Sequence, residues 1–183
     1  MSYRVHSIET APEGARDDLA KACERYGFLP NLLGVMAEAP TLLRGYLGLM
    51  RLFEESSLTP TERQIVLLTV SHENVCTYCV AAHSVIAEIQ KVPAEVIQAI
   101  RDDVPIPDPK LEALRRFARA VVIGRGHPGK AALDGFIAAG YSEANVLEVV
   151  LGVGVKTLSN YTNHIAETPL DAAFAPAKWD KVA

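Results

Sequence analysis

The spacing of hydrophobic residues is helical along nearly the whole chain. Apolar side chains recur at three- and four-residue intervals, which places them on one face of an α-helix. Such stretches cover residues 14–27, 40–57, 59–72, 93–103, 111–124, 130–140 and 142–164, and a shorter helical segment follows Pro30. Only "AVVIG" at 120–124 resembles a strand, and it continues a helical pattern. We therefore predict an all-α fold in a single domain, 1–183.

Capping residues mark several of the helix starts. Thr59 suits the N-cap, Pro60 the first helical position, and Glu62 completes a capping box. Ser142 marks a similar start for the long apolar helix at 142–164. Asn74 is expected to cap a further helix, which contains "CTYC" and runs to about residue 91.

Two segments are expected not to be helical. Three prolines within "DVPIPDPK" predict an extended connection inside the domain, at Pro105–Pro109. The final segment, "TPLDAAFAPAKWDKVA", carries two more prolines and is expected to form an extended C-terminal tail. This tail would pack on the domain or reach a neighbouring subunit.

Composition narrows the class of protein. The 183 residues are 49% hydrophobic and 22% charged, and the net charge of -4 argues against nucleic-acid binding, which needs a basic surface. The most apolar stretch, Ala144 to Ser159, contains Glu148 and Lys156 and falls short of the roughly 18–20 apolar residues that span a bilayer. The N-terminal residues lack the apolar stretch of a signal peptide. We expect a cytoplasmic protein that binds no membrane.

The candidate chemistry lies in "NVCTYCVAAHSV", residues 74–85. On a helix, Cys76 and Cys79 lie about 60° apart, and His83 falls within about 40° of each. Cys76 would lie in the first turn, where the helix end favours a thiolate, and His83 would reach Cys79 at the i,i+4 spacing. The three side chains therefore predict a redox-active dithiol with its own base.

The cysteines allow three other interpretations. The thiols could simply pack in an apolar helix, as Cys23 is expected to do. A zinc site could use Cys76, Cys79 and His83, but a structural site needs a fourth ligand, and the sequence has no second CxxC. A thioredoxin-type module is disfavoured, because its CxxC follows a strand in a βαβ unit.

The sequence resembles a known family. "CTYCVAAH" after the capped "LTPTERQIVLLTVSHEN", together with "NYTNHIAETPLD", is similar to alkylhydroperoxidase D (AhpD)-like proteins of the carboxymuconolactone decarboxylase superfamily, in the peroxidase-related subgroup. The resemblance covers about residues 30–175. It implies an AhpD-like helical fold that forms homo-oligomers, as trimers, hexamers or dimers.

The resemblance also implies a thiol-dependent peroxidase activity. Cys79 would attack the peroxide, Cys76 would resolve the product to a disulfide, and His83 would belong to a proton relay. A lipoylated or thioredoxin-like protein would supply the reducing dithiol, and neither an organic cofactor nor a metal is needed. The alternative functions are a non-catalytic thiol redox sensor and a decarboxylase- or isomerase-like member of the superfamily.

Two positions depart from the family pattern. Gln64 stands twelve residues before the first cysteine, where the family has its relay glutamate, and Tyr78 replaces a histidine. Glu73 is the preferred substitute acid and Glu62 the second, although a solvated Glu73 and a capping Glu62 are the plainer interpretations. Tyr78 could donate a hydrogen bond to a peroxide or thiolate, or pack at a subunit contact.

The polar end of the last long helix is a further candidate. Tyr161, Asn163 and His164 could line the pocket or could simply form a polar helix end. His72, at the end of the preceding helix, is interpreted as a histidine favoured by the helix dipole.

Overall fold

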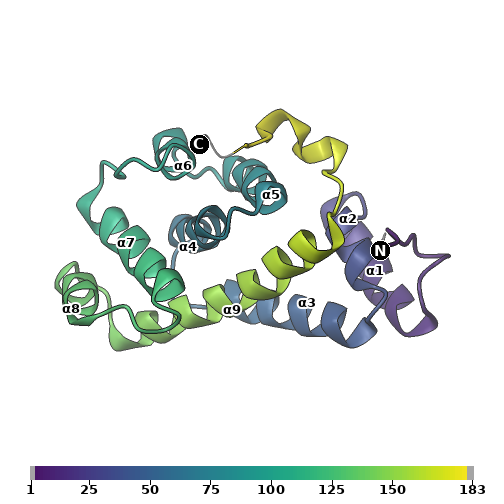
Figure 1. The fold of residues 1–183 in the computed structure, drawn as a ribbon, viewed down its shortest axis with the longest axis horizontal. Helices are drawn as coiled ribbons and strands as arrows, with labels where there is room; N and C mark the ends of the chain where they lie inside the picture. The colour runs from purple at the N-terminus through teal and green to yellow at the C-terminus, as the bar shows by residue number, and fades with distance from the viewer. Residues whose placement is uncertain (1–2, 181–183) are drawn as a thin grey trace.

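The computed structural model describes residues 3–180, and every regular element in this range is a helix, which confirms the all-α prediction (Figure 1). The elements are α1 (Glu13–Tyr26), α2 (Asn31–Met36), α3 (Pro40–Glu54), α4 (Pro60–Glu73), α5 (Thr77–Ile89), α6 (Ala94–Arg101), α7 (Pro109–Ile123), α8 (Lys130–Ala138), α9 (Glu143–Ala166) and a 3-10 helix, η1 (Ala172–Ala177).

Helix α4 is the centre of the fold. It packs against α5, α6, α7 and α9, and residues 64–72 are all buried. Its start is the predicted capping box, in which Thr59 and Glu62 each accept a hydrogen bond from the other's backbone N–H. A helix that is apolar on all sides is stable only when other helices surround it, as they do here.

The 24-residue helix α9 runs along one side of the molecule beside α3 (Figure 1). Ser142 is its N-cap, as predicted. Gly152 lies at the crossing with α3 and α4, where a Cβ atom would come within 2.7 Å of Val66 Cγ1 and 2.9 Å of the Phe53 ring. The absence of a side chain at this position is what allows α9 to approach so closely.

The C-terminal segment turns back from the end of α9 toward α5 and α6 (Figure 1). It forms η1 instead of the predicted extended arm, and it packs on its own chain. Trp179 Nε1 donates to the Arg101 carbonyl oxygen at 3.0 Å, and its ring lies 5.1 Å from that of His72.

The helix lengths bear on the membrane prediction. Within residues 3–180, no single helix is both long and apolar enough to cross a bilayer. Only α8 and α9 taken together, bent by 119°, reach the required length and composition.

Candidate functional site

The site begins at the junction of α4 and α5. Asn74 is the C-cap of α4, so the prediction that it caps the next helix is wrong. The Cys76 N–H donates to the Ser71 carbonyl and the Val75 N–H to the His72 carbonyl, both at 2.9 Å, which is the pattern of a Schellman motif. Val75 occupies the left-handed position, at φ 54°, where glycine is the usual residue.

This junction moves the start of α5 by two residues. Cys76 is the N-cap of α5, and Cys79 is its third residue. Cys79 rather than Cys76 therefore lies in the first turn, where the free N–H groups favour a thiolate. Both sulfurs are in free cysteines and both residues are buried.

Helix α9 supplies the polar contacts of the sulfurs. Asn163 Nδ2 lies 3.2 Å from Cys79 Sγ and 3.8 Å from Cys76 Sγ, and Ser159 Oγ lies 3.9 Å from Cys79 Sγ. One turn away, Asn160 Oδ1 accepts a 2.9 Å hydrogen bond from Asn74 Nδ2, which ties the junction to α9. Asn163 thus lies at the site, as one of the two interpretations of the α9 end expected.

Tyr161 and His164 are exposed, and they lie on the part of α9 that faces away from the sulfurs. For these two residues the interpretation as a polar helix end holds.

The two thiols differ in the direction of their pKa shifts. Burial alone would raise the pKa of Cys79, but the hydrogen bond from Cys76 and the positive charge of Lys156 outweigh it and hold that pKa well below the usual range. The pKa of Cys76 is raised, first by its hydrogen bond to the Cys79 sulfur and then by burial. Cys79 is therefore the thiolate of the pair.

His83 is bound by Gln64. His83 Nδ1 lies 3.0 Å from Gln64 Oε1, and because a carbonyl oxygen only accepts, Nδ1 carries the proton and Nε2 is the free acceptor. Burial, followed by the Lys156 charge, holds the pKa of His83 well below its usual value, so the ring is neutral. Within residues 3–180, His83 makes no direct hydrogen bond to Cys79, although the i,i+4 spacing suggested that the ring could reach this sulfur.

The two predicted substitute acids lie in other contacts. The Glu73 carboxylate is 3.5 Å from His72 Nδ1 and 3.3 Å from Arg119 Nε, on the side of α4 that faces α7. Glu62 accepts from Thr59 in the capping box, and those hydrogen bonds lower its pKa against the opposing effect of burial. The side chain that contacts His83 is Gln64, which corrects the expectation that Glu73 or Glu62 serves it.

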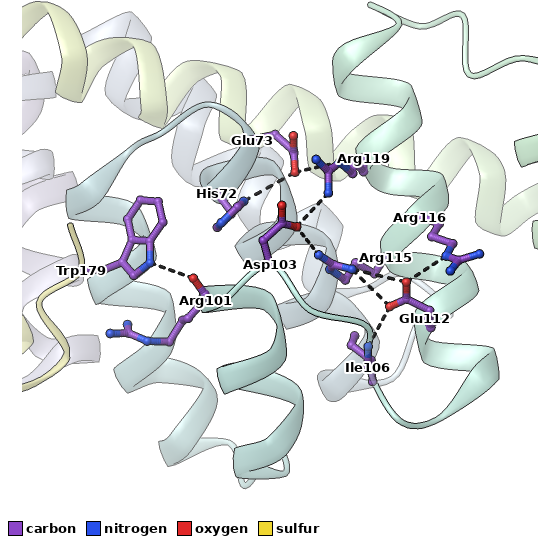
Figure 2. A network of polar contacts seen from close by, with 10 residues as sticks. All are labelled: His72, Glu73, Arg101, Asp103, Ile106, Glu112, Arg115, Arg116, Arg119 and Trp179. Atoms are coloured by element: carbon purple, nitrogen blue, oxygen red, sulfur yellow. Dashed lines mark hydrogen bonds and ion pairs between the residues drawn. The ribbon is translucent and has the colours of Figure 1, made fainter. Parts of the chain in front are cut away.

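Figure 2 shows that Glu73 belongs to a separate polar network. Asp103 accepts from Arg119 at 2.8 Å and from Arg115 at 2.5 Å. His72, Glu73 and Asp103 are close enough together to share a cation. The two arginines already neutralise the carboxylates that a cation would need.

Tyr78 has a structural partner. Its hydroxyl donates to Asp171 Oδ2 at 2.5 Å and accepts from the Leu32 N–H at 3.3 Å. Asp171 also accepts from the Asn31 N–H at 3.0 Å, so this cluster joins the C-terminal segment to α5 and α2. The pKa of Tyr78 is raised by burial and then by Asp171. The Tyr78 hydroxyl therefore holds the C-terminal segment and does not contact the sulfurs.

A small apolar cavity of about 180 Å³ adjoins the Cys79 side chain. Apolar and aromatic residues form most of its wall, among them Phe28, Leu33, Tyr46 and Phe174; Cys79, His83 and Lys156 also line it. His83 lines a second, more polar cavity of about 440 Å³ as well, together with Gln64, Gln90 and Arg63. Cys79 thus lines a largely apolar space, and His83 lines both that space and the polar one.

Comparison with known proteins gives a family match for part of the chain. The sequence profile of the Carboxymuconolactone decarboxylase family matches residues 37–120, which include α4, the CxxC and His83. The fold of the chain is AhpD-like. No curated protein matches this sequence.

Solved structures share this fold over nearly the whole chain. An AhpD-core, peroxidase-related protein from Ralstonia eutropha JMP134 is 21% identical, with a TM-score of 0.83 over 98% of this chain and 97% of its own. The debrominase Bmp8 C82A in complex with 2,3,4-tribromopyrrole is 20% identical, with a TM-score of 0.80 over 97% and 96%. A peroxidase-related protein from Silicibacter sp. TM1040 is 17% identical, with a TM-score of 0.80 over 94% and 93%.

One residue of the site was not predicted from the sequence. Lys156 is fully buried on α9 and lines the same cavity as Cys79 and His83. The signal in the sequence was a single lysine within an otherwise apolar stretch of helix. A lysine almost never lies in such a buried stretch unless it has a charged partner.

Proposed function

We propose that the protein is a thiol-dependent peroxidase that works through a dithiol–disulfide cycle of Cys76 and Cys79. One observation supports this most: two free cysteines contact the same Asn163 amide, and Cys79, in the first turn of α5, lines a cavity. The opposite directions of their pKa shifts agree with this arrangement. A dithiol peroxidase needs this division between an attacking and a resolving sulfur. The match of residues 37–120 to the Carboxymuconolactone decarboxylase family and the AhpD-like fold support the same proposal.

The cycle has three steps. The Cys79 thiolate attacks the terminal oxygen of a hydroperoxide, the O–O bond breaks, and the alkoxide leaves and takes up a proton, which makes Cys79 a sulfenic acid. The Cys76 sulfur attacks this sulfenic acid, an S–S bond forms, and water leaves with the Cys76 proton. An external dithiol then reduces the disulfide and is itself oxidised to a disulfide.

The neutral His83 ring has a defined part in this cycle. Its Nε2 is the candidate base for the Cys76 proton as the second step begins, and it would return that proton to the departing hydroxide, which leaves as water. Because Gln64 is uncharged, it does not stabilise the imidazolium form of His83. The ring should therefore release the proton quickly.

The test is turnover of cumene hydroperoxide and hydrogen peroxide with dihydrolipoamide as reductant. The wild-type protein should turn over at least one of them, Cys79→Ser should abolish turnover, and Cys76→Ser should trap a sulfenic acid that dimedone labels. Cys23→Ser is the matched control and should keep full activity, because Cys23 lies on α1. Full turnover by Cys79→Ser would reject the mechanism.

A second candidate function is reductive dehalogenation of an apolar aromatic substrate by the same dithiol. The largely apolar wall with Phe28, Tyr46 and Phe174 favours it, since this cavity would accept an aromatic ring. The similar fold of a debrominase agrees with this candidate. Bromide release from 2,3,4-tribromopyrrole in the presence of dihydrolipoamide, without peroxide turnover, would support it over the peroxidase.

Two further outcomes of the same assays would favour other functions. Stoichiometric oxidation of the pair by one equivalent of peroxide, without turnover, would indicate a redox sensor. Protein that is not oxidised at all would leave a decarboxylase- or isomerase-like activity of the superfamily.

Partners and assembly form part of the proposal. We expect a lipoylated or thioredoxin-like protein of the cytoplasm to supply the electrons. We also expect homo-oligomers, because Leu147, Val150 and Ile165 of α9 each expose half or more of their surface. Light scattering of the purified protein at several concentrations would test the assembly.

A further inference from the structure

We propose that Lys156 is the positioning residue of the dithiol: its buried ammonium holds Cys79 in the thiolate form and selects it over Cys76 as the attacking sulfur. This inference rests on the proposed function for the role of Cys79 as nucleophile. Its physical content, a charge pair between Lys156 and Cys79, can be tested without any peroxide.

The first argument is burial. Lys156 has an exposed fraction of 0%, although lysine almost always extends its amine to solvent. Its Nζ meets the strict geometry of a hydrogen bond with none of the described residues, although the Cys79 sulfur lies near enough for Lys156 to lower the Cys79 pKa. A buried ammonium without a compensating charge is strongly destabilising, so the site needs a negative charge close by.

The second argument is the choice of counter-charge. The titratable side chains that line the cavity with Lys156 are Cys79, His83, Tyr26, Tyr46 and Tyr78. None of them is a carboxylate. Burial raises the pKa of Tyr46 and of Tyr78, and His83 is neutral, so the Cys79 thiolate is the anion available to Lys156.

The third argument is the geometry of α9. Lys156, Ser159 and Asn163 are spaced at i, i+3 and i+7, which places them on one face of the helix. Ser159 and Asn163 both contact Cys79 Sγ. One face of α9 thus presents a cation and two polar groups to the same sulfur. The pKa shifts agree, because the Lys156 charge lowers the pKa of both Cys79 and His83.

The experiment measures the ionisation of Cys79 directly. The chain has three cysteines, so a Cys23→Ser/Cys76→Ser protein has Cys79 as its sole thiol. Thiolate absorbance at 240 nm against pH gives its midpoint. Adding Lys156→Met should raise that midpoint by roughly 1–3 pH units, the usual effect of a close opposite charge, and slow alkylation by iodoacetamide at pH 7 by about tenfold or more. Lys156→Arg, which keeps the charge, should restore most of the low midpoint.

The matched control is Lys130→Met in the same background, because Lys130 is exposed and pairs only with Asp134. It should leave the midpoint unchanged. An unchanged midpoint in Lys156→Met would overturn the inference, as would a Cys79 midpoint at or above that of a free thiol before Lys156 is altered.

Folding gives an independent readout. Lys156→Met removes a buried charge and leaves Cys79 to take up a proton as a neutral thiol, so the variant should melt at the same temperature or higher. If Lys156→Met and Lys156→Gln both failed to fold, Lys156 would serve the fold and not the sulfur, and the inference would be wrong. Wild-type protein without peroxide turnover, but with a midpoint that depends on Lys156, would reject the proposed function and leave the charge pair standing.

Discussion

Replacing Gln64 by glutamate should place a carboxylate beside His83 that can exchange a proton with the ring. In the wild-type protein the amide oxygen of Gln64 lies 3.0 Å from His83 Nδ1, and the ring is buried and neutral. Gln64→Glu puts a carboxylate at that position with little change in volume. A negative charge next to Nδ1 stabilises the imidazolium form, so the pKa of His83 should rise.

The size of the rise follows from the distance. At 3.0 Å and an effective dielectric constant of about 20, two unit charges attract by roughly 5.5 kcal/mol, or about 4 pKa units. Burying the new carboxylate offsets several kcal/mol of this, since Gln64 is itself 4% exposed. We expect a net rise of about 1–3 units.

Stability against acid gives a second measure of the same change. The folded pKa of His83 lies below its unfolded value of about 6.5, so the unfolded state binds the extra proton and stability falls as pH drops below about 6.5. The slope from this one group is about 1.4 kcal/mol per pH unit. A raised folded pKa in Gln64→Glu removes this part of the acid sensitivity.

The assays are histidine NMR titration, with His83 assigned by its loss in His83→Asn, and urea unfolding at pH 7 and pH 5. Gln90→Glu is the matched control: Gln90 Oε1 accepts from Gln64 Nε2 at 3.2 Å, is exposed, and does not contact His83. Because this carboxylate is exposed and separated from the ring by Gln64, it should raise the pKa of His83 much less than Gln64→Glu does. A His83 pKa in Gln64→Glu equal to that of the wild type would refute the role given to the Gln64–His83 contact.

Three further substitutions test the framework of the site. Tyr78→Phe removes the hydroxyl that binds Asp171 and should lower the free energy of unfolding by about 1–3 kcal/mol with little change in turnover; lost turnover at unchanged stability would contradict this. Gly152→Ala places a methyl group 2.7 Å from a side chain and should destabilise the fold by about 1–3 kcal/mol. Gly154→Ala, with open space around it, is the control and should leave the stability unchanged or raise it. Equal effects of the two substitutions in urea unfolding would be inconsistent with the close helix crossing. Val75 has a left-handed backbone conformation, which is unfavourable for valine by about 1–2 kcal/mol. Val75→Gly removes this strain but makes the unfolded chain more flexible, so the melting temperature should rise only slightly. A lower melting temperature would show that the valine is not strained.

The helices were predictable because their signals are local. The capping box at Thr59 and the N-cap at Ser142 depend on residues within the first helical turn, and both are present as predicted. The junction before the cysteines was not predictable in this way. Its left-handed residue is a valine, so the glycine that usually marks a helix end is missing, and Asn74 was assigned to the wrong helix.

The site divides along the same line. The spacing of Cys76, Cys79 and His83 is a local property, and the structure places all three in one region. Their partners are set by tertiary packing. Glu73 was expected at His83, but Arg119, which lies 46 positions later in the chain, binds it on the other side of α4. No sequence pattern within α4 carries that information.

The two unexpected features of the site explain each other through charge. A glutamate at position 64 would add an anion to a buried space that already holds the Cys79 thiolate, and the Lys156 ammonium would then face two negative groups. With glutamine there, one thiolate and one ammonium balance, and His83 stays neutral between them. An uncharged residue at position 64 therefore leaves the Cys79 thiolate as the partner of the buried lysine, in place of a carboxylate. It follows that in a Cys79→Ser background, where no thiolate can be lost, Gln64→Glu combined with Lys156→Met should raise the pKa of His83 further than Gln64→Glu alone, because the double change removes a repelling cation as well as adding an anion.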